Sequence, residues 1–186
     1  MVTPGDTSRL ARDNVSGVNS QSSPALPHLD RTGAAHMVDI SEKDGSTRVA
    51  VAEAVFNTTE PVIALLADGN LPKGDALATA RLAGVMAAKR TADLIPLCHT
   101  VQLTGVSVQL VPATSSVTVT ATARCVGRTG VEMEALTAVA VASLALHDMV
   151  KAVDPCATIT DVRLVSKTGG KRGDWDRTGE HETERT

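Results

Sequence analysis

The stretch VSVQLVPATSSVTVTATA, residues 106–123, decides the fold class of this chain. Apolar and polar residues alternate over Val106–Val111 and again over Val117–Ala123, which is the pattern of strands that bury one face. Residues 112–116, PATSS, lie between the two runs and favour a turn. The stretch therefore predicts two antiparallel strands joined as a hairpin.

Three segments precede the hairpin and two follow it. Arg48–Phe56 has β-branched residues at alternate positions and predicts a strand. Two helices are predicted next: Thr58–Ala67, which opens with a capping Thr and a Pro suited to the first turn, and the Ala-rich Lys73–Arg90. After the hairpin, Glu132–Val153 predicts a long helix and Thr158–Val165 a last strand. This order is that of a ferredoxin-like sandwich, so we predict an α+β fold in which helices cover one face of a four-stranded antiparallel sheet.

The long helix also predicts self-association. Between Ala135 and Leu146 its apolar residues face nearly every direction, and a helix that is apolar all round is buried all round. One sheet can cover only one side, so a second subunit is the simplest cover for the other, and we predict a homo-oligomer. The uncharged run Ala135–His147 has 13 residues, fewer than the ~20 that span a bilayer, so no membrane interaction is expected.

Composition indicates one globular domain. The chain has 186 residues, of which 42% are apolar and 21% charged. We place the ferredoxin-like domain at residues 30–173, between polar, aperiodic segments at 1–29 and 174–186 that are interpreted as flexible tails. Because the N-terminus lacks the apolar core of a signal peptide, a soluble, cytoplasmic protein is expected.

Charge and cysteine content argue against other classes of protein. The net charge is −3, which gives no reason to expect a nucleic-acid partner. The three cysteines, Cys98, Cys125 and Cys156, are far apart and lack CxxC spacing. They are interpreted as reduced thiols rather than ligands of a structural metal.

Two polar clusters in the first half of the chain are candidates for chemistry. Lys73-Gly74-Asp75 opens the second predicted helix, where the helix N-terminus and a mobile cation favour an anion; the alternative is a solvated first turn. In the second cluster, residues 93–100, Cys98 and His99 are adjacent. Adjacent side chains of an extended segment point to opposite faces, so His99 is interpreted as a ligand contact rather than half of a dyad. A half-buried, satisfied histidine is the alternative.

Two further clusters involve the long helix and the end of the last strand. Residues 130–134, GVEME, open the helix, and Asp148 and Lys151 lie on one face near its end. A carboxylate beside Lys151 would hold the amine protonated; the alternative is a surface ion pair worth about 0.3–0.5 kcal/mol. Residues 167–173, KTGGKRG, combine glycines with three cations and predict a phosphate-binding segment, or alternatively a flexible basic exit. This is not a Walker loop, because the GxxxxGK[ST] spacing is absent.

Together these segments resemble the cyclic pyranopterin monophosphate synthase family of molybdenum-cofactor synthesis. The resemblance covers about residues 33–174 and rests on many motifs in one order. The motifs are HMVDIS (36–41), KGD (73–75), ATAR (78–81), AAKRT (87–91), LIPLCH (94–99), GVEMEALT (130–137), DMVKAV (148–153) and Lys167 with GGK (169–171). The family implies a ferredoxin-like fold and hexamers built as trimers of dimers, with active sites at the dimer interface.

The resemblance further implies a lyase that converts 3′,8-cyclo-7,8-dihydroguanosine 5′-triphosphate into cyclic pyranopterin monophosphate and pyrophosphate. Matched by position, Asp148 is the family's catalytic acid, and Lys73 and Lys151 are the general acid/base pair. The matched substrate contacts are Leu97, Cys98, His99, Met133, Glu134, Arg48 and Lys167. Proton transfers and the expulsion of pyrophosphate need acids, bases and cations, so no cofactor and no metal ligands are expected.

Two other functions share these features. A non-enzymatic ferredoxin-like module that binds a small anionic regulator would use the same fold and basic segment without needing Asp148. An RNA-binding sheet of the same topology would stack bases on aromatic residues, yet the chain's only Phe and Trp are Phe56 and Trp175, and it has no Tyr. The chain departs from the family pattern at Thr100, where Pro is common, and at Arg172, which replaces a small residue.

Overall fold

One antiparallel sheet organises the computed structural model, which describes residues 34–42, 44–69, 71–171 and 173–177. Its strands are β1 (Ser46–Asn57), β2 (Leu103–Pro112), β3 (Ser116–Gly127), β4 (Thr158–Thr168) and the short β5 (Trp175–Asp176). They lie in the order β2-β3-β1-β4-β5, and β2 and β3 pair as the predicted hairpin. The succession of strands and helices is that of the ferredoxin-like fold, which confirms the predicted α+β class.

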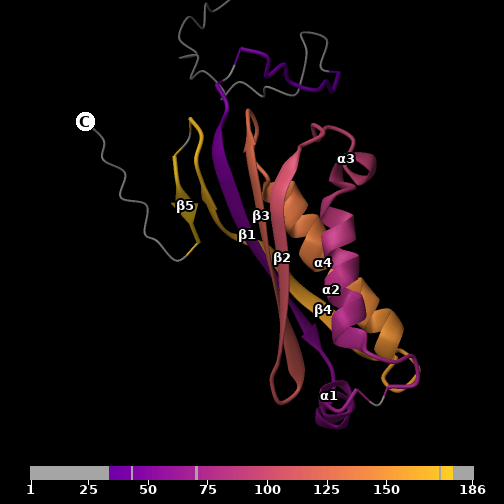
Figure 1. The fold of residues 1–186 in the computed structure, drawn as a ribbon. Coiled ribbons are helices and arrows are strands. Elements are labelled where there is room, and N and C mark those ends of the chain that lie inside the picture. Colours follow the sequence, from indigo (N-terminus) through magenta and orange to yellow (C-terminus); the bar gives the residue numbers. More distant parts are fainter. Residues whose placement is uncertain (1–33, 43, 70, 172, 178–186) are drawn as a thin grey trace, which may run out of the picture. The chain divides into compact units, whose positions relative to one another are not determined.

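Helices cover one face of this sheet (Figure 1). The described helices are α1 (Glu60–Ala67), α2 (Ala76–Ala88), the short α3 (Thr91–Leu94) and α4 (Glu132–Val150). Helix α4 packs against β1, β3 and β4, while α2 packs against α4 and β2. Helix α2 begins at Ala76 rather than at Lys73, because the Asp75 side chain accepts a hydrogen bond from the Ala78 N–H and caps the helix.

The core consists largely of small residues. Fully buried alanines line the inner face of the sheet and the facing side of α4: Ala50, Ala52, Ala54, Ala121, Ala123, Ala135, Ala138 and Ala142. Gly84 of α2 lies so close to α4 that a Cβ there would be 2.9 Å from the Ala138 carbonyl oxygen. The small side chains therefore let α4 approach both the sheet and α2 closely, and Phe56 is the one aromatic residue in the described core.

Two elements were not predicted. Helix α3 has four residues and β5 has two, which is too short for a hydrophobic period to show. Strand β5 pairs Trp175 with Lys167 and lies within the segment 174–186 that was expected to be a tail. The expected tail at 1–29 and the residues after 177 lie outside the described ranges.

Helix α4 is covered on two sides within one chain, so the premise that only the sheet could cover it is wrong: α2 is the second cover. A stripe remains open, on which Leu144 is 59% exposed and Leu136 and Ala140 are partly exposed. Among the described helices α4 alone is long and apolar enough to cross a membrane, but 56% of that stretch is buried inside the protein, as in a core helix.

Candidate active site

The first group of predicted residues meets where α2 begins and α4 ends; we call Lys73, Asp148 and Lys151 the lysine–aspartate cluster. Lys73 Nζ donates to Asp148 Oδ2 at 2.7 Å and to the Asp148 backbone oxygen at 2.8 Å. Lys151, the residue directly after α4, has its Nζ 2.8 Å from Oδ1 of Asp148, three positions earlier in the chain. The start of α2 lies beside the end of α4 (Figure 1), and this brings a lysine 75 residues away in sequence onto the carboxylate.

Both lysines stabilise the ionised form of Asp148. Hydrogen bonds from Lys151 and then Lys73 lower the pKa of Asp148 from 3.8 to about 2. The three side chains are 41–56% exposed, so the cluster is open to a ligand. In this state Asp148 is a carboxylate that holds two ammonium groups in place, and the cluster carries a net positive charge that suits an anionic guest.

A second group lies at the opposite end of the sheet and of α4; we call Arg48, Glu132, Glu134 and Lys167 the arginine cluster. Lys167 pairs with Ala50 across β1 and β4, and Ala50 faces the helices, so Lys167 points to the same side. Lys167 Nζ donates to Glu132 Oε1 at 3.1 Å.

The glycines that follow β4 allow close packing against Arg48. Gly169 and Gly170 have φ values of +86° and +95°, and a Cβ on Gly170 would overlap the Arg48 guanidinium. The Nε of Arg48 is buried and has no hydrogen-bond partner among the described residues. A buried donor without a partner is costly, and a bound anion would satisfy it.

The segment after α3 brings Cys98 and His99 toward this second group. The His99 Nε2 atom is 2.8 Å from the Val38 carbonyl oxygen; a carbonyl only accepts, so Nε2 carries a hydrogen. Burial and the nearby charge of Glu134 raise the pKa of the Cys98 thiol, which disfavours a thiolate nucleophile. Glu134 is only 4% exposed, and burial raises its pKa. The other two predicted contacts, Leu97 and Met133, lie beside Cys98 and Glu134 in the chain; Leu97 is exposed and Met133 is partly exposed.

The two clusters are far apart within one chain. Glu134 and Asp148 are separated by 14 residues of α4, which corresponds to about 21 Å along the helix axis. The structure thus brings the three predicted catalytic residues together, and separately groups Arg48, Lys167 and Glu134. It does not unite the two groups in one protomer.

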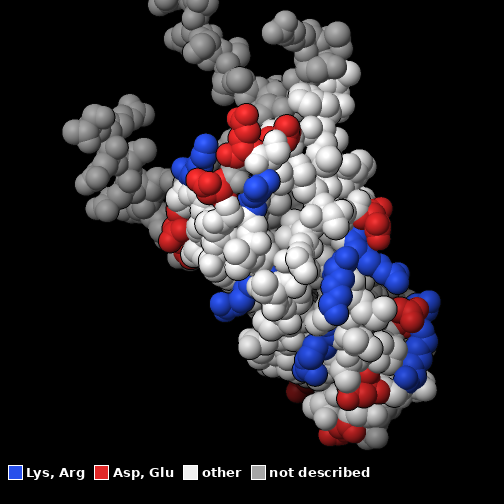
Figure 2. Space-filling model, turned by 45° about the horizontal axis from the view of Figure 1, so that its top comes forward, with Lys and Arg blue, Asp and Glu red and all other residues white. Residues whose placement is uncertain are grey.

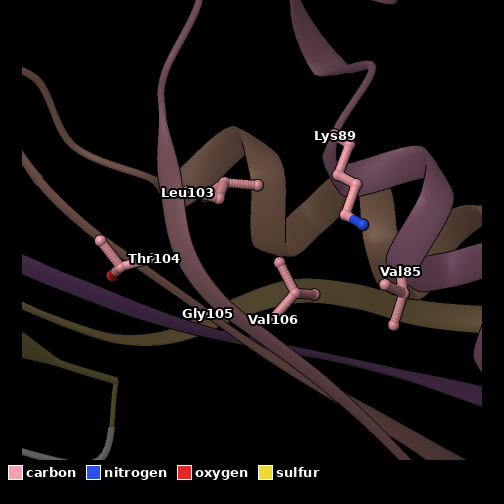
Figure 3. A pocket seen from close by; sticks show the side chains of 6 residues that line it. All are labelled: Val85, Lys89, Leu103, Thr104, Gly105 and Val106. Atoms are coloured by element: carbon pink, nitrogen blue, oxygen red, sulfur yellow. The ribbon is translucent and has the colours of Figure 1, made fainter.

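One residue of the arginine cluster was not singled out by the sequence. Glu132 was seen only as part of the GVEME motif, and its contact with Lys167 joins residues 35 positions apart. Separately, a cavity of about 260 Å³ lies between α2 and the start of β2, lined by Val85, Lys89 and residues 103–106 (Figure 3). It contains no predicted site residue and a single charged side chain, so we do not place the chemistry there.

Neither the RNA-binding alternative nor a metal centre gains support from the described residues. Phe56 is fully buried, and the Arg177 guanidinium lies 5.5 Å from the centre of the Trp175 ring, so neither ring is a free stacking platform. On the face shown in Figure 2, positive and negative side chains are interspersed. The described residues contain no group of three or more His, Cys, Asp or Glu side chains that could hold a metal ion.

Comparison with known proteins identifies a family for this chain. Residues 37–170 match the model of the MoaC family. The chain is 58% identical over 162 residues to a Mycobacterium tuberculosis protein named cyclic pyranopterin monophosphate synthase 2, covering 87% of this chain and 97% of that protein. It is 59% identical over 153 residues to the Streptomyces griseus cyclic pyranopterin monophosphate synthase, covering 82% and 86% respectively. This chain belongs to the MoaC family.

Proposed function

We propose that this protein is a cyclic pyranopterin monophosphate synthase, a lyase that converts 3′,8-cyclo-7,8-dihydroguanosine 5′-triphosphate into cyclic pyranopterin monophosphate and pyrophosphate in molybdenum-cofactor synthesis. The observation that carries the proposal is the contact of Lys73 and Lys151 with one carboxylate, Asp148, at 2.7 and 2.8 Å. The names of the relatives, whose sequences align over most of this chain, support the same reaction.

The lysine–aspartate cluster supplies the proton transfers. Rearrangement of the ring system needs protons moved at several atoms. Of the two ammonium groups on the Asp148 carboxylate, one acts as the proton donor, and the other becomes an acceptor once it has given up its own proton. Closure of the cyclic phosphate needs a substrate hydroxyl to attack the α-phosphorus and lose its proton to an amine. The bond to the β-phosphate oxygen then breaks, and pyrophosphate leaves with the electron pair. Asp148, which the resemblance matches to the family's catalytic acid, has a pKa lowered to about 2 in this state by the two lysines, and we propose that it also fixes the two amines. No redox cofactor is needed for these steps.

The arginine cluster binds the substrate. Arg48 and Lys167 offer cations to the triphosphate, while Cys98, His99 and Glu134, together with their neighbours Leu97 and Met133, contact the ring system. Cations near the leaving pyrophosphate stabilise the charge that develops on it. This division of labour requires the two clusters to serve one substrate, although they lie about 21 Å apart along α4.

A second copy of the chain resolves that separation. The partly exposed Leu136 and Ala140 and the exposed Leu144 of α4 lie on the helix face that leads to Asp148. Two copies that pair along this stripe with antiparallel α4 helices place the lysine–aspartate cluster of one beside the arginine cluster of the other. We propose such dimers, assembled in threes as a homohexamer in the cytoplasm, where the three free cysteines stay reduced.

The test is direct turnover. We expect the purified protein to release one pyrophosphate for each cyclic triphosphate consumed, with cyclic pyranopterin monophosphate identified by mass. Lys73→Met and Lys151→Met should each lower the rate by 10²-fold or more, the usual order for a lost general acid or base. Lys89→Met, which removes an exposed α2 lysine outside both clusters, is the matched control. A ligand that binds tightly without any turnover would instead support the anion-binding module.

A further inference from the structure

The first turn of α4 presents a carboxylate to one of the proposed phosphate-binding cations. Glu132 Oε1 lies 3.1 Å from Lys167 Nζ, and the two side chains are only 29% and 26% exposed. They come from different elements, since Glu132 starts α4 and Lys167 is near the end of β4. The pair is therefore a tertiary contact in a half-buried place rather than a pair on an open helix surface.

The chain leaves room for this contact. A Cβ added at Gly130 would overlap the Glu132 carboxylate. Any other residue at position 130 would force the carboxylate to move. Gly130 thus leaves space for the side-chain direction in which Glu132 meets Lys167.

Lys167, which contacts Glu132, has a second charged neighbour on the same face of the sheet, Arg48. Lys167 is on the same face of the sheet as Arg48, because each lies beside a buried residue of the neighbouring strand, Ala50 for Lys167 and Cys125 for Arg48. Arg48 also influences the pKa of the buried Cys125, as do Glu132 and Glu134. A lysine has a long side chain with many rotamers, and the hydrogen bond to Glu132 selects among them.

We infer that Glu132 is a positioning residue that holds Lys167 beside Arg48, so that the two cations together grip the pyrophosphate part of the substrate. The inference rests on the proposed function, because it takes Lys167 as a phosphate contact. It adds a residue that touches no substrate and acts through Lys167.

The direction in which Glu132→Gln changes the affinity for pyrophosphate distinguishes a positioning role from a purely electrostatic one. Replacing Glu132 by Gln removes a negative charge beside an anion site, so electrostatics alone predicts tighter binding of pyrophosphate. Positioning predicts the opposite, because the freed Lys167 must be ordered again when the anion binds. We expect Glu132→Gln to raise the Kd for pyrophosphate, and the KM for the triphosphate, by about tenfold, with kcat within about twofold of the wild type.

Trp175 provides the binding readout. It is the only Trp in the chain and pairs with Lys167 across β4 and β5, so its fluorescence can be followed during a titration with pyrophosphate. In a Lys167→Met background, Glu132→Gln should not raise the Kd for pyrophosphate any further. Glu53→Gln, which breaks the 2.6 Å ion pair with Arg163 elsewhere on the sheet, is the control and should bind pyrophosphate like the wild type.

Three outcomes would overturn the inference: unchanged or tighter binding in Glu132→Gln, or an equal loss with and without Lys167. If Glu132→Gln does not fold, Gly130→Ala tests the same point, because it displaces the carboxylate while keeping its charge. The pyrophosphate titration needs no turnover. Absence of turnover in the wild type would therefore count against the proposed function, while the titration would still decide the role of Glu132.

Discussion

Two inactive variants of this protein will restore each other's activity if each active site takes residues from two copies. The first variant, Lys73→Met, damages the lysine–aspartate cluster. The second, Lys167→Met, damages the arginine cluster at the other end of α4. Each is expected to be inactive alone, because every site in its homodimer contains the defect.

The expected recovery follows from the separation of the clusters. Glu134 and Asp148 lie 14 residues apart on α4, about 21 Å, so a shared site combines one cluster from each copy. In a mixed dimer one site collects both defects and the other collects neither. Random exchange makes about half of all dimers mixed, each with one intact site of two, so about a quarter of wild-type activity should return.

The assay is pyrophosphate release after the two variants are co-expressed or refolded together, with subunit exchange verified by native mass spectrometry. The matched control mixes Lys73→Met with Lys151→Met, which damage the same cluster; every mixed site then has a defect, and no activity should return. Zero recovery from the first mixture despite proven exchange would refute the shared site.

Three other changes have defined outcomes. Leu144→Glu puts a charge on the open stripe of α4, where the side chain is 59% exposed. It should break the proposed dimers, so that sedimentation gives a species smaller than the hexamer, with unchanged circular dichroism and lost turnover. An intact hexamer would show that the stripe is not the dimer interface. Because the pKa of Asp148 is lowered to about 2, its contribution to stability is present above about pH 4 and is lost as the pH falls toward 2. In urea melts between these pH values, Asp148→Asn should therefore lose less stability on acidification than the wild type. Identical pH dependence in the two proteins would argue against the lysine contacts in solution. Gly84→Ala, whose Cβ would be 2.9 Å from the Ala138 carbonyl oxygen, should destabilise the fold by about 1–3 kcal/mol; a neutral effect in chemical denaturation would mean that α2 and α4 are less tightly packed.

Most of the fold followed from the sequence because its strands and helices are long enough to show a period. The hairpin of β2 and β3 has alternating residues over both strands. The first residues of the helices were harder to predict. The sequence around Lys73 is typical of a helix, but Asp75 caps α2, so the helix begins at Ala76. The cover that α2 gives to α4 was missed because a contact between two helices depends on their packing, which no local pattern encodes.

In the candidate site, too, contacts between residues close in the sequence were predictable, and contacts between distant residues were not. Asp148 and Lys151 are three residues apart on one helix, so spacing alone predicted their contact. The local sequence singled out Lys73 as a cation at a helix start, and the resemblance grouped it with Asp148 and Lys151; the structure puts its ammonium on the same carboxylate. Glu132 was missed because its partner Lys167 is brought to it only by the register of β4 in the sheet.

The alanine-rich interior has a mechanical consequence. An alanine side chain has no rotamers, so folding freezes no side-chain motion at these positions, and a perturbation cannot be absorbed by a rotamer change. At these positions the distance from α4 to the strands is consequently set by contacts of backbone atoms and methyl groups. Helix α4 therefore holds the lysine–aspartate cluster and the arginine cluster at a nearly constant spacing, which the proposed active site between two copies would require.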